Sequence, residues 1–255
     1  MKEKLTIIKV GGKIVENPDS LAALLDQFAA LEGCKILVHG GGRTATDMAA
    51  RLGVETTMVN GRRITDAAML DVVTMVYAGL VNKNVVAKLQ ARGVNALGLT
   101  GADMNVIASV KRPVKDVNYG FVGDVQQVDG QRLAQLLNSG ITPVMAPLTH
   151  DGLGNMLNTN ADTIAGETAK ACAKHFETTL IYCFEFPGVM SNPDDLNSVI
   201  PHINSVTFEQ LKTDGTVSGG MIPKIENALA AVEAGVHQVI IRHADHLAVG
   251  GTTIK

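Results

Sequence analysis

The chain of 255 residues is poor in aromatic side chains and carries little net charge. It has no tryptophan, and aromatic residues make up only 4% of it, which leaves few surfaces on which nucleic-acid bases could stack. The net charge is −3 and the isoelectric point is near 6.2, so the composition does not indicate a nucleic-acid-binding surface. We therefore expect no nucleic-acid partner.

Long apolar runs and paired cysteines are also missing. No apolar run reaches the ~18 residues that span a bilayer, and the residues after Met1 show no signal-peptide pattern. The three cysteines, Cys34, Cys172 and Cys183, are an odd number in apolar contexts without metal-ligand spacing. We expect buried reduced thiols, no metal held by the protein, no membrane partner and a cytoplasmic location.

Strand-like and helix-like segments alternate along the chain. Short β-rich runs predict strands at residues 4–10, 35–39, 96–99, 142–146, 179–184 and 239–242. Amphipathic stretches predict helices at residues 20–31, 43–52, 66–91, 131–139, 161–174 and 221–234. The alternation predicts an α/β fold, a three-layer αβα sandwich with a mainly parallel central sheet.

One region departs from this alternation. Between Asp103 and Val125 the runs become short and alternating, which predicts antiparallel hairpins at a sheet edge. No linker or low-complexity tract interrupts the chain. We expect a single domain over residues 1–255, with approximate lobes at 1–155 and 156–255 that share one sheet.

Two lysines near opposite ends of the chain each lie beside paired glycines. Lys9 precedes Gly11 and Gly12, and Lys224 follows Gly219 and Gly220. An ammonium group can neutralise charge on a transferring phosphoryl group, and glycine lets backbone N–H groups approach its oxygens. A solvated lysine beside a tight turn is the alternative for either pair alone.

A run of three glycines strengthens the phosphoryl-transfer interpretation. Residues 40–42 lie between a predicted strand and a predicted helix, the arrangement in which unpaired N–H groups favour an anion. Parallel strands end at one edge of a sheet, so two anion sites are expected there. Walker A, GxGxxG and protein-kinase signatures are absent from the sequence, which argues against the common nucleotide folds.

Five motifs in order, covering essentially the whole chain, carry a family resemblance. They are Ile8-Lys9-Val10-Gly11-Gly12, Val38-His39-Gly40-Gly41-Gly42, Asn60-Gly61-Arg62-Arg63-Ile64-Thr65, Asn158-Thr159-Asn160-Ala161-Asp162 and Gly219-Gly220-Met221-Ile222-Pro223-Lys224. Together they resemble the amino-acid kinase family and, within it, the N-acetylglutamate kinases. The resemblance implies ATP-dependent phosphorylation of the γ-carboxylate of an N-acyl-L-glutamate in arginine biosynthesis, with Mg²⁺ arriving with the nucleotide.

The resemblance also implies a role for each motif residue. Lys9 and Lys224 are expected to flank the transferring phosphoryl group, with Asp162 holding both lysines. The substrate-binding residues implied are Gly41, Gly42, Arg63, Asn158 and Asn160. The nucleotide-binding residues implied are Gly11, Gly12, Glu185, Gly188, Thr216, Ser218 and Gly220. The first lobe would bind the acylglutamate and form a dimer, and the second would bind the nucleotide.

Several of these residues also have an ordinary structural explanation. Residues 158–162 would also serve as ordinary helix caps, and Arg63 could be a surface salt-bridge residue, as we expect of its neighbour Arg62. His243 and His246 have no third ligand in register, so we expect no metal there. At residues 183–189 the family pattern is altered: Glu185 stands where the resemblance leads us to expect aspartate, which leaves nucleotide affinity and base preference open.

Three functional alternatives remain. The acyl group could be succinyl instead of acetyl, which would require room and a cation for its extra carboxylate. The acceptor could be carbamate, aspartate or a nucleoside monophosphate, because the fold hosts several such kinases. The chain could also be a non-catalytic amino-acid or nucleotide sensor.

The start of the chain and one apolar stripe bear on assembly. Only residues 1–3 precede the first predicted strand, fewer than one helical turn of about 3.6 residues. Arginine-inhibited family members carry an N-terminal helix that links dimers, so we expect a homodimer insensitive to arginine. Its interface is expected to include the stripe Met69, Val72, Val73, Val76 and Leu80, for which core packing is the alternative.

Overall fold

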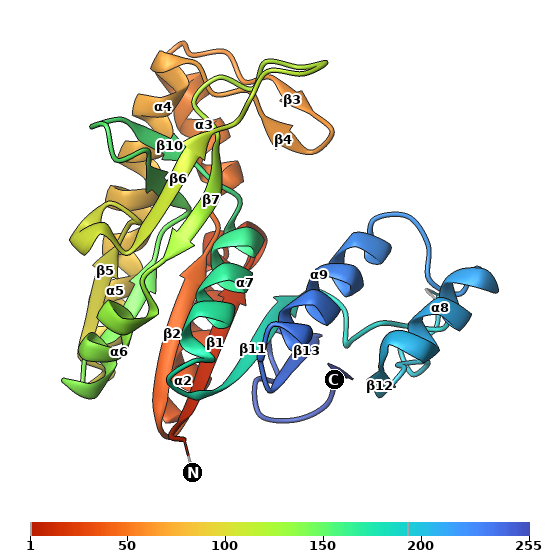
Figure 1. The fold of residues 1–255 in the computed structure, drawn as a ribbon. Helices are drawn as coiled ribbons and strands as arrows, with labels where there is room; N and C mark the ends of the chain where they lie inside the picture. Colours follow the sequence, from red (N-terminus) through yellow and green to blue (C-terminus); the bar gives the residue numbers. More distant parts are fainter. Residues whose placement is uncertain (1, 193) are drawn as a thin grey trace.

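An eight-stranded sheet runs through the molecule (Figure 1), and the computed structural model describes residues 2–192 and 194–255. In spatial order its strands are β12 (His202–Ile203), β14 (Thr252–Ile254), β13 (Gln238–His243), β11 (Glu177–Phe184), β1 (Lys4–Val10), β2 (Cys34–His39), β8 (Thr142–Met145) and β5 (Ala96–Leu99). Every neighbouring pair is parallel except β13 and β14. The predicted mainly parallel α/β fold is confirmed.

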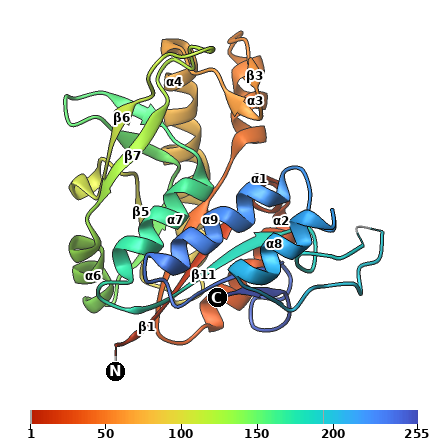
Figure 2. The same ribbon diagram turned by 45° about the vertical axis from the view of Figure 1, so that its right-hand side comes forward.

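Helices cover both faces of this sheet (Figures 1 and 2). One face carries α6 (Gly130–Asn138), α7 (Ala161–Cys172), α8 (Ser205–Thr213) and α9 (Met221–Glu233). The other carries α1 (Gly12–Glu16), α2 (Pro18–Ala30) and α5 (Asn82–Gln90). Alternation along β1 explains the two layers, because Leu5 and Ile7 pack into one core cluster and Ile8 and Val10 into the other.

All six predicted strands and all six predicted helices form, with ends shifted by one or two residues. Local side-chain chemistry explains where α2 begins. The side chain of Asn17 accepts hydrogen bonds from the N–H groups of Asp19 and Ser20, and Pro18 occupies the first helical turn. The elements that were not predicted are α1, α8, β12, β14 and the strands of the next paragraph that lie outside its predicted hairpin.

A smaller sheet stands above the carboxyl ends of the central strands (Figure 1). It contains β10 (Met156–Asn158), β9 (Leu148–His150), β6 (Ile107–Lys111) and β7 (Gly123–Val128). The antiparallel pair β6 and β7 confirms the hairpin predicted in this region. A separate hairpin, β3 (Met58–Val59) with β4 (Arg62–Arg63), projects beside it. Irregular segments therefore gather at the edge where ligands bind in parallel sheets.

One long helix combines α4 (Ala67–Val73), a π-helical stretch η1 (Thr74–Val81) and α5. Its 24 residues, Ala67–Gln90, are long and apolar enough to cross a membrane, judged by length and composition alone. The mean hydropathy of its most apolar 18 residues is 1.2, and 44% of that stretch is buried inside the molecule. The buried side chains belong to the core clusters of this chain, as they do in core helices of globular proteins. Length and composition alone therefore do not make this helix a membrane span.

The expected interface stripe on this helix is largely wrong. Four of its five residues are at most 1% exposed within the chain, because they pack against α3 (Gly42–Arg51) and β9; these are Met69, Val72, Val73 and Val76. Leu80 is 45% exposed and Met75 is 54% exposed. The helical spacing identified a buried face correctly and assigned it the wrong partner. Among the cysteines, Cys172 and Cys183 are buried as expected, whereas Cys34 is partly exposed.

His39 ends β2 in a fully buried position. Its Nδ1 lies 2.7 Å from the carbonyl oxygen of Gly40, and its Nε2 lies 3.1 Å from Asn82 Nδ2. Nδ1 therefore carries the proton and Nε2 accepts one from Asn82. Burial lowers the pKa of His39 to about 4, an effect that the charge of Lys83 reinforces and the hydrogen bond to Gly40 opposes. A second proton on Nε2 would face the amide donor of Asn82.

This buried histidine predicts a loss of stability in acid. Because its folded pKa lies below its ordinary value of 6.5, the unfolded chain binds the proton first as the pH falls. The loss begins near pH 6.5, is complete below the folded pKa, and amounts to about 2 kcal/mol by pH 5. Urea unfolding between pH 7 and 5 should show a shallower pH dependence for His39→Asn than for the unmodified chain. His202→Asn, at an exposed position, should keep the original slope; equal slopes for all three would contradict the assignment.

Candidate active site

Two glycine turns meet where β1 and β2 end. The N–H of Gly40 donates to the carbonyl oxygen of Val10 at 3.0 Å, which ties the second turn to the end of β1. A Cβ atom on Gly40 would lie 3.0 Å from the nitrogen of Gly12, and one on Gly12 would lie 3.5 Å from the nitrogens of Gly41 and Gly42. Gly41 also has φ of +154°, at the limit of the range that favours glycine. A side chain at Gly40 would therefore press on the backbone of the first turn, whereas the distances from Gly12 to the second turn are ordinary contacts.

Glu16 connects the helices that follow the turns. Its Oε1 accepts hydrogen bonds from the backbone N–H of Thr44 at 2.9 Å and from the Thr44 hydroxyl at 3.2 Å. This carboxylate at the end of α1 therefore occupies donors in the first turn of α3. The backbone N–H groups of Gly41 and Gly42 remain at the mouth of a cavity described below.

Lys9, Asp162, Phe184 and Lys224 form one cluster beside these turns. Lys9 is 8% exposed and lies on the same side of β1 as Leu5 and Ile7, facing α7. Its Nζ is 2.7 Å from Asp162 Oδ1, so the two side chains form an ion pair. Within the described part of the chain no donor is aligned for a hydrogen bond to this buried oxygen. Asp162 occupies the first turn of α7.

The aromatic ring of Phe184 connects the two lysines. Lys224 Nζ lies 4.1 Å from the ring centroid and Lys9 Nζ lies 5.8 Å from it, distances at which cation–π attraction operates. Within residues 2–192 and 194–255 Asp162 forms an ion pair with Lys9 and none with Lys224. The structure therefore brings together all three predicted catalytic residues, with an unpredicted aromatic ring in the place of a second ion pair.

The surroundings shift the pKa of Lys224 downward. Burial is the main cause, repulsion from Lys9 adds to it, and attraction to Asp162 opposes it. Burial and the neighbouring ammonium group therefore both disfavour the charged form of Lys224. An incoming anion would relieve both the desolvation and the repulsion.

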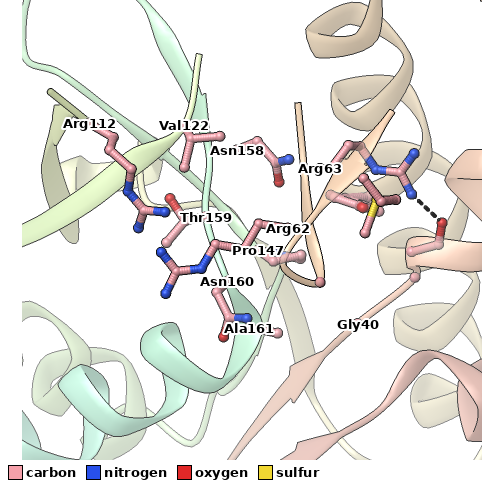
Figure 3. Close-up of a pocket in the computed structure, with 15 residues that line it drawn as sticks. Gly40, Arg62, Arg63, Arg112, Val122, Pro147, Asn158, Thr159, Asn160 and Ala161 are labelled. Atoms are coloured by element: carbon pink, nitrogen blue, oxygen red, sulfur yellow. Dashed lines mark hydrogen bonds between the residues drawn. The ribbon is translucent and has the colours of Figure 1, made fainter. Parts of the chain in front are cut away.

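A cavity of about 230 Å³, which we call the central cavity, opens between the glycine turns and the small sheet (Figure 3). Its lining includes all five predicted substrate-binding residues: Gly41, Gly42, Arg63, Asn158 and Asn160. Arg63 is 8% exposed, which excludes the surface salt-bridge alternative, and its Nη2 donates to Gly42 O at 2.7 Å and to Thr46 Oγ1 at 2.8 Å. Asn158 Nδ2 donates to Thr65 Oγ1 at 2.9 Å.

The polar residues before α7 divide their tasks. The side chain of Asn160 accepts from the N–H groups of Asp162 and Thr163 and is the N-cap of α7. Asn158 makes no contact of this kind and faces the central cavity (Figure 3). Capping and cavity lining therefore both hold in this segment, because Asn160 does both and Asn158 lines the cavity alone.

Two further arginines line the central cavity. Arg62, expected to be a surface salt-bridge residue, is exposed but forms no ion pair within the described residues, so that interpretation is wrong. Arg112 follows β6 and donates from Nε and Nη2 to Asp124 Oδ1 at 2.9 and 2.5 Å. Consecutive residues of a strand point to opposite sides, which explains why Arg62 and Arg63 reach different walls of the cavity. Sequence offered no motif for Arg112.

The predicted nucleotide-binding residues fall into separate places. Gly11 and Gly12 belong to the first glycine turn, and Thr216, Ser218 and Gly220 immediately precede α9, which carries Lys224. Glu185 Oε2 pairs with Lys13 Nζ at 2.6 Å, and both side chains are more than half exposed. Gly188 is buried: a Cβ there would lie 2.8 Å from Thr252 Oγ1 and from Val199, so packing accounts for this glycine.

No group of three or more His, Cys, Asp or Glu side chains is placed to hold a metal ion within the described parts of the chain. His243 lies 3.6 Å from Asp245, measured from Nδ1 to Oδ2, and its ring centroid is 6.1 Å from that of His246.

The glycine contacts predict different outcomes for two similar substitutions. Gly40→Ala places a methyl group against the Gly12 backbone and should lower the free energy of unfolding by about 1 to 3 kcal/mol, as overpacking does. Gly11→Ala meets nothing within 4 Å at an ordinary φ of −75°, so it should keep its stability. Urea unfolding measures both, and a Gly40→Ala variant as stable as the unmodified chain would show that the two turns do not pack as described.

Comparison with known proteins places this geometry in a family. Residues 4–243 match the Amino acid kinase family. The chain is 66% identical over 256 residues to an acetylglutamate kinase of Bacteroides thetaiotaomicron, covering 100% of both chains. It is 40% identical over 254 residues to an acetylglutamate kinase of Methanopyrus kandleri, covering 98% of this chain and 99% of that one.

A solved structure gives the same fold. N-acetylglutamate synthase from Neisseria gonorrhoeae, complexed with coenzyme A and N-acetyl-glutamate, superposes with a TM-score of 0.81 at 22% identity, covering 99% of this chain and 59% of that one. At this identity the likeness concerns the fold alone. The family match and the full-length relatives together establish that the chain belongs to the amino acid kinase family.

Proposed function

We propose that this protein is an ATP-dependent kinase that phosphorylates the γ-carboxylate of an N-acyl-L-glutamate in arginine biosynthesis, the acceptor being N-acetylglutamate in the relatives named above. The observation that carries the proposal is the position of Lys9, Lys224 and Asp162 beside a cavity lined by Arg63 and Asn158. Full-length identity of 66% to an acetylglutamate kinase supports it.

The reaction needs no general base. A γ-carboxylate has an ordinary pKa of about 4.3, so it is ionised at neutral pH and can attack the terminal phosphorus directly. The γ-phosphoryl group passes to the carboxylate oxygen, the bond to the ADP oxygen breaks, and ADP leaves. The protein must therefore position two anions and neutralise the charge that spreads over the transferring group.

The cluster around Phe184 supplies that neutralisation. Two ammonium groups and one carboxylate leave a net positive charge next to the glycine N–H groups. Asp162 holds Lys9, and the ring of Phe184 supports both lysines without reducing their charge. The glycine turns leave backbone room for phosphate oxygens that a Cβ atom would take up.

Magnesium would arrive with ATP. The carboxylate that the described residues place beside the lysines, Asp162, is already paired with Lys9, which suits an ion coordinated mainly by phosphate oxygens and water. When bound, such an ion neutralises part of the phosphate charge. Lys9 and Lys224 would remain the protein's own contribution at the transferring group.

Arg63 and Asn158 would bind the amino-acid end of the acceptor. Hydrogen bonds from Nη2 to Gly42 O and Thr46, and from Nη1 to Thr56 and Met69, hold the guanidinium of Arg63 in place and leave its Nε–H for a carboxylate. We place acylglutamate binding in residues 1–155, together with the segment 158–161, and nucleotide binding in the remainder of residues 156–255, where Lys224 and its preceding loop lie. A sensor without activity would have no need of the two clustered lysines.

Replacing either lysine should slow the chemical step. Lys9→Ala and Lys224→Ala each remove one cation from the transferring group, so kcat should fall by about 10² to 10³ with a smaller change in KM. Lys212→Ala, which removes a lysine paired with Glu209 on α8, is the matched control and should change kcat less than threefold by the weakness of surface ion pairs.

A coupled ADP-release assay measures these effects with N-acetylglutamate as acceptor, and with glutamate, aspartate and carbamate as alternatives. Turnover of one of these alternatives in preference to N-acylglutamates would replace the proposed acceptor. Binding without turnover of any acceptor would favour the sensor.

We also propose a cytoplasmic homodimer that is insensitive to arginine. The support is the pair Met75 and Leu80, large apolar side chains that remain 54% and 45% exposed on the long helix after the buried stripe has packed into the core. Large apolar side chains of this kind are more stable when buried in an interface between two copies than when exposed to water.

Charge placed on that face should separate the copies. Met75→Lys with Leu80→Lys is expected to turn a dimer into a monomer in light scattering at several concentrations, because two ammonium groups would be buried without partners. Leu153→Lys, at an exposed residue of the turn between β9 and β10, should leave the mass unchanged. A monomeric or hexameric unmodified chain, or inhibition by millimolar arginine, would contradict the proposal.

A further inference from the structure

Resting on the function proposed above, we propose that Arg62 and Arg112 form a second anion subsite that selects acceptors whose acyl group itself ends in a carboxylate, as a succinyl group does. The subsite lies on the side of the central cavity away from Arg63 (Figure 3). It would determine acyl-group specificity and leave the phosphoryl-transfer cluster unchanged.

The charges around the central cavity do not balance. Three guanidinium groups line it, from Arg62, Arg63 and Arg112, and its described lining contains no aspartate or glutamate. Asp124, outside this lining, pairs with Arg112, so two of the three guanidinium groups have no carboxylate partner among the described residues. In the proposed reaction the γ-carboxylate of the acceptor is used at the lysines, and the α-carboxylate suffices for one arginine. An acetyl group would bring no further charge, whereas a dicarboxylic acyl group would bring one.

Neither of the two arginines is fully satisfied. Arg62 forms no ion pair with any described residue. Arg112 is held by Asp124 through Nε and Nη2, while its Nη1 is buried without a hydrogen-bond partner in the described structure. An unpartnered buried donor of a charged group is costly. Asp124 thus positions Arg112 and leaves a nitrogen that an acceptor oxygen would satisfy after a small movement of the covering side chains.

The two guanidinium groups are placed to act together. Figure 3 shows both turned toward the same part of the cavity, near Thr159, from opposite walls. Arg62 comes from the β3–β4 hairpin and Arg112 from the loop after β6. Two like charges that converge on one space repel each other, and a carboxylate between them would convert that repulsion into two charge-assisted hydrogen bonds.

The cavity has room for a longer acyl chain at this point. Arg62 and Arg112 also line a second cavity of about 320 Å³, whose lining includes Lys115 and two aspartates, Asp116 and the Asp124 that pairs with Arg112. The two arginines therefore mark the junction of two hollow spaces. An acyl chain that extends from the central cavity would reach them before it reaches open solvent.

The test compares two acceptors of matched size and one shorter acceptor in the ADP-release assay. N-succinyl-L-glutamate carries the extra carboxylate, N-butanoyl-L-glutamate has the same chain length with a methyl group in its place, and N-acetyl-L-glutamate is the short reference. The unmodified chain should show a kcat/KM for the succinyl acceptor about 10- to 100-fold above that for the butanoyl acceptor, the range for a charge-assisted hydrogen bond.

Substitution of one exposed residue, Arg62, tests the source of the preference for the succinyl acceptor. Arg62→Met should abolish most of that preference, chiefly through KM, and change the other two acceptors less than about threefold, because it removes charge and keeps length. Lys111→Met is the matched control: this lysine ends β6, lies over the ring of Phe121 at 4.4 Å and belongs to neither cavity lining. It should leave the preference intact.

The outcomes separate this inference from the function on which it rests. Equal kcat/KM for succinyl and butanoyl acceptors, or a preference that survives in Arg62→Met, would overturn the subsite while the kinase proposal stands on turnover of N-acetylglutamate. If no acceptor were turned over, the kinase proposal would fail. Calorimetry would then still decide the subsite, since it predicts tighter binding of the succinyl than of the butanoyl compound and loss of this difference in Arg62→Met.

Discussion

The site depends on the register in which β1 and β2 pair. Val10 stands opposite His39, so the two parallel strands end at the same level and their glycine turns meet. A shift by one residue would reverse the faces of β1, sending Lys9 away from α7 and Ile8 toward it. The buried Leu5, Ile7, Ile8 and Val10 make such a shift costly, because they fill two separate core clusters. Packing of the sheet therefore fixes the position of the charged groups.

From that register, the remaining contacts follow in order. Lys9 meets Asp162 because α7 crosses the face of β1 on which the odd-numbered residues lie. Phe184 ends β11, the other neighbour of β1, and so comes to lie beside the same ammonium group. Lys224 approaches the ring from α9. Residues from four elements distant in sequence thus converge where three parallel strands end.

Much of the fold was predictable, and the reason is periodicity. The central strands and the amphipathic helices carry their patterns within a few residues, so each predicted segment formed with small shifts at its ends. The short elements, such as α1, β3 and β4, have too few residues to show a period. The stripe from Met69 to Val76 shows the limit of the same signal, because spacing identifies a buried face and does not say whether the chain itself or a second copy covers it.

The candidate site was predictable where glycine and lysine combine in motifs, and not elsewhere. Gly41, Gly42, Arg63 and Asn158 share one cavity as the resemblance implied. Arg62 lies in one of the motifs but was expected to be a surface salt-bridge residue, and Arg112 has no local signature; only the folded hairpins bring the two to one cavity. Phe184 belongs to the altered strand end at residues 183–189, and no pattern in the sequence says that two cations will share its ring.

That shared ring has a consequence for the rate at which the nucleotide binds. An aromatic support attracts cations without neutralising them, so two ammonium groups and one carboxylate leave the mouth of the site positive while it is empty. A positive focus between low-dielectric walls accelerates the encounter with a polyanion, and dissolved salt weakens it over a Debye length of about 8 Å at physiological ionic strength. A carboxylate in the place of Phe184 would have held the lysines as firmly and removed this long-range attraction. The choice of a neutral partner therefore makes association with the triphosphate sensitive to ionic strength.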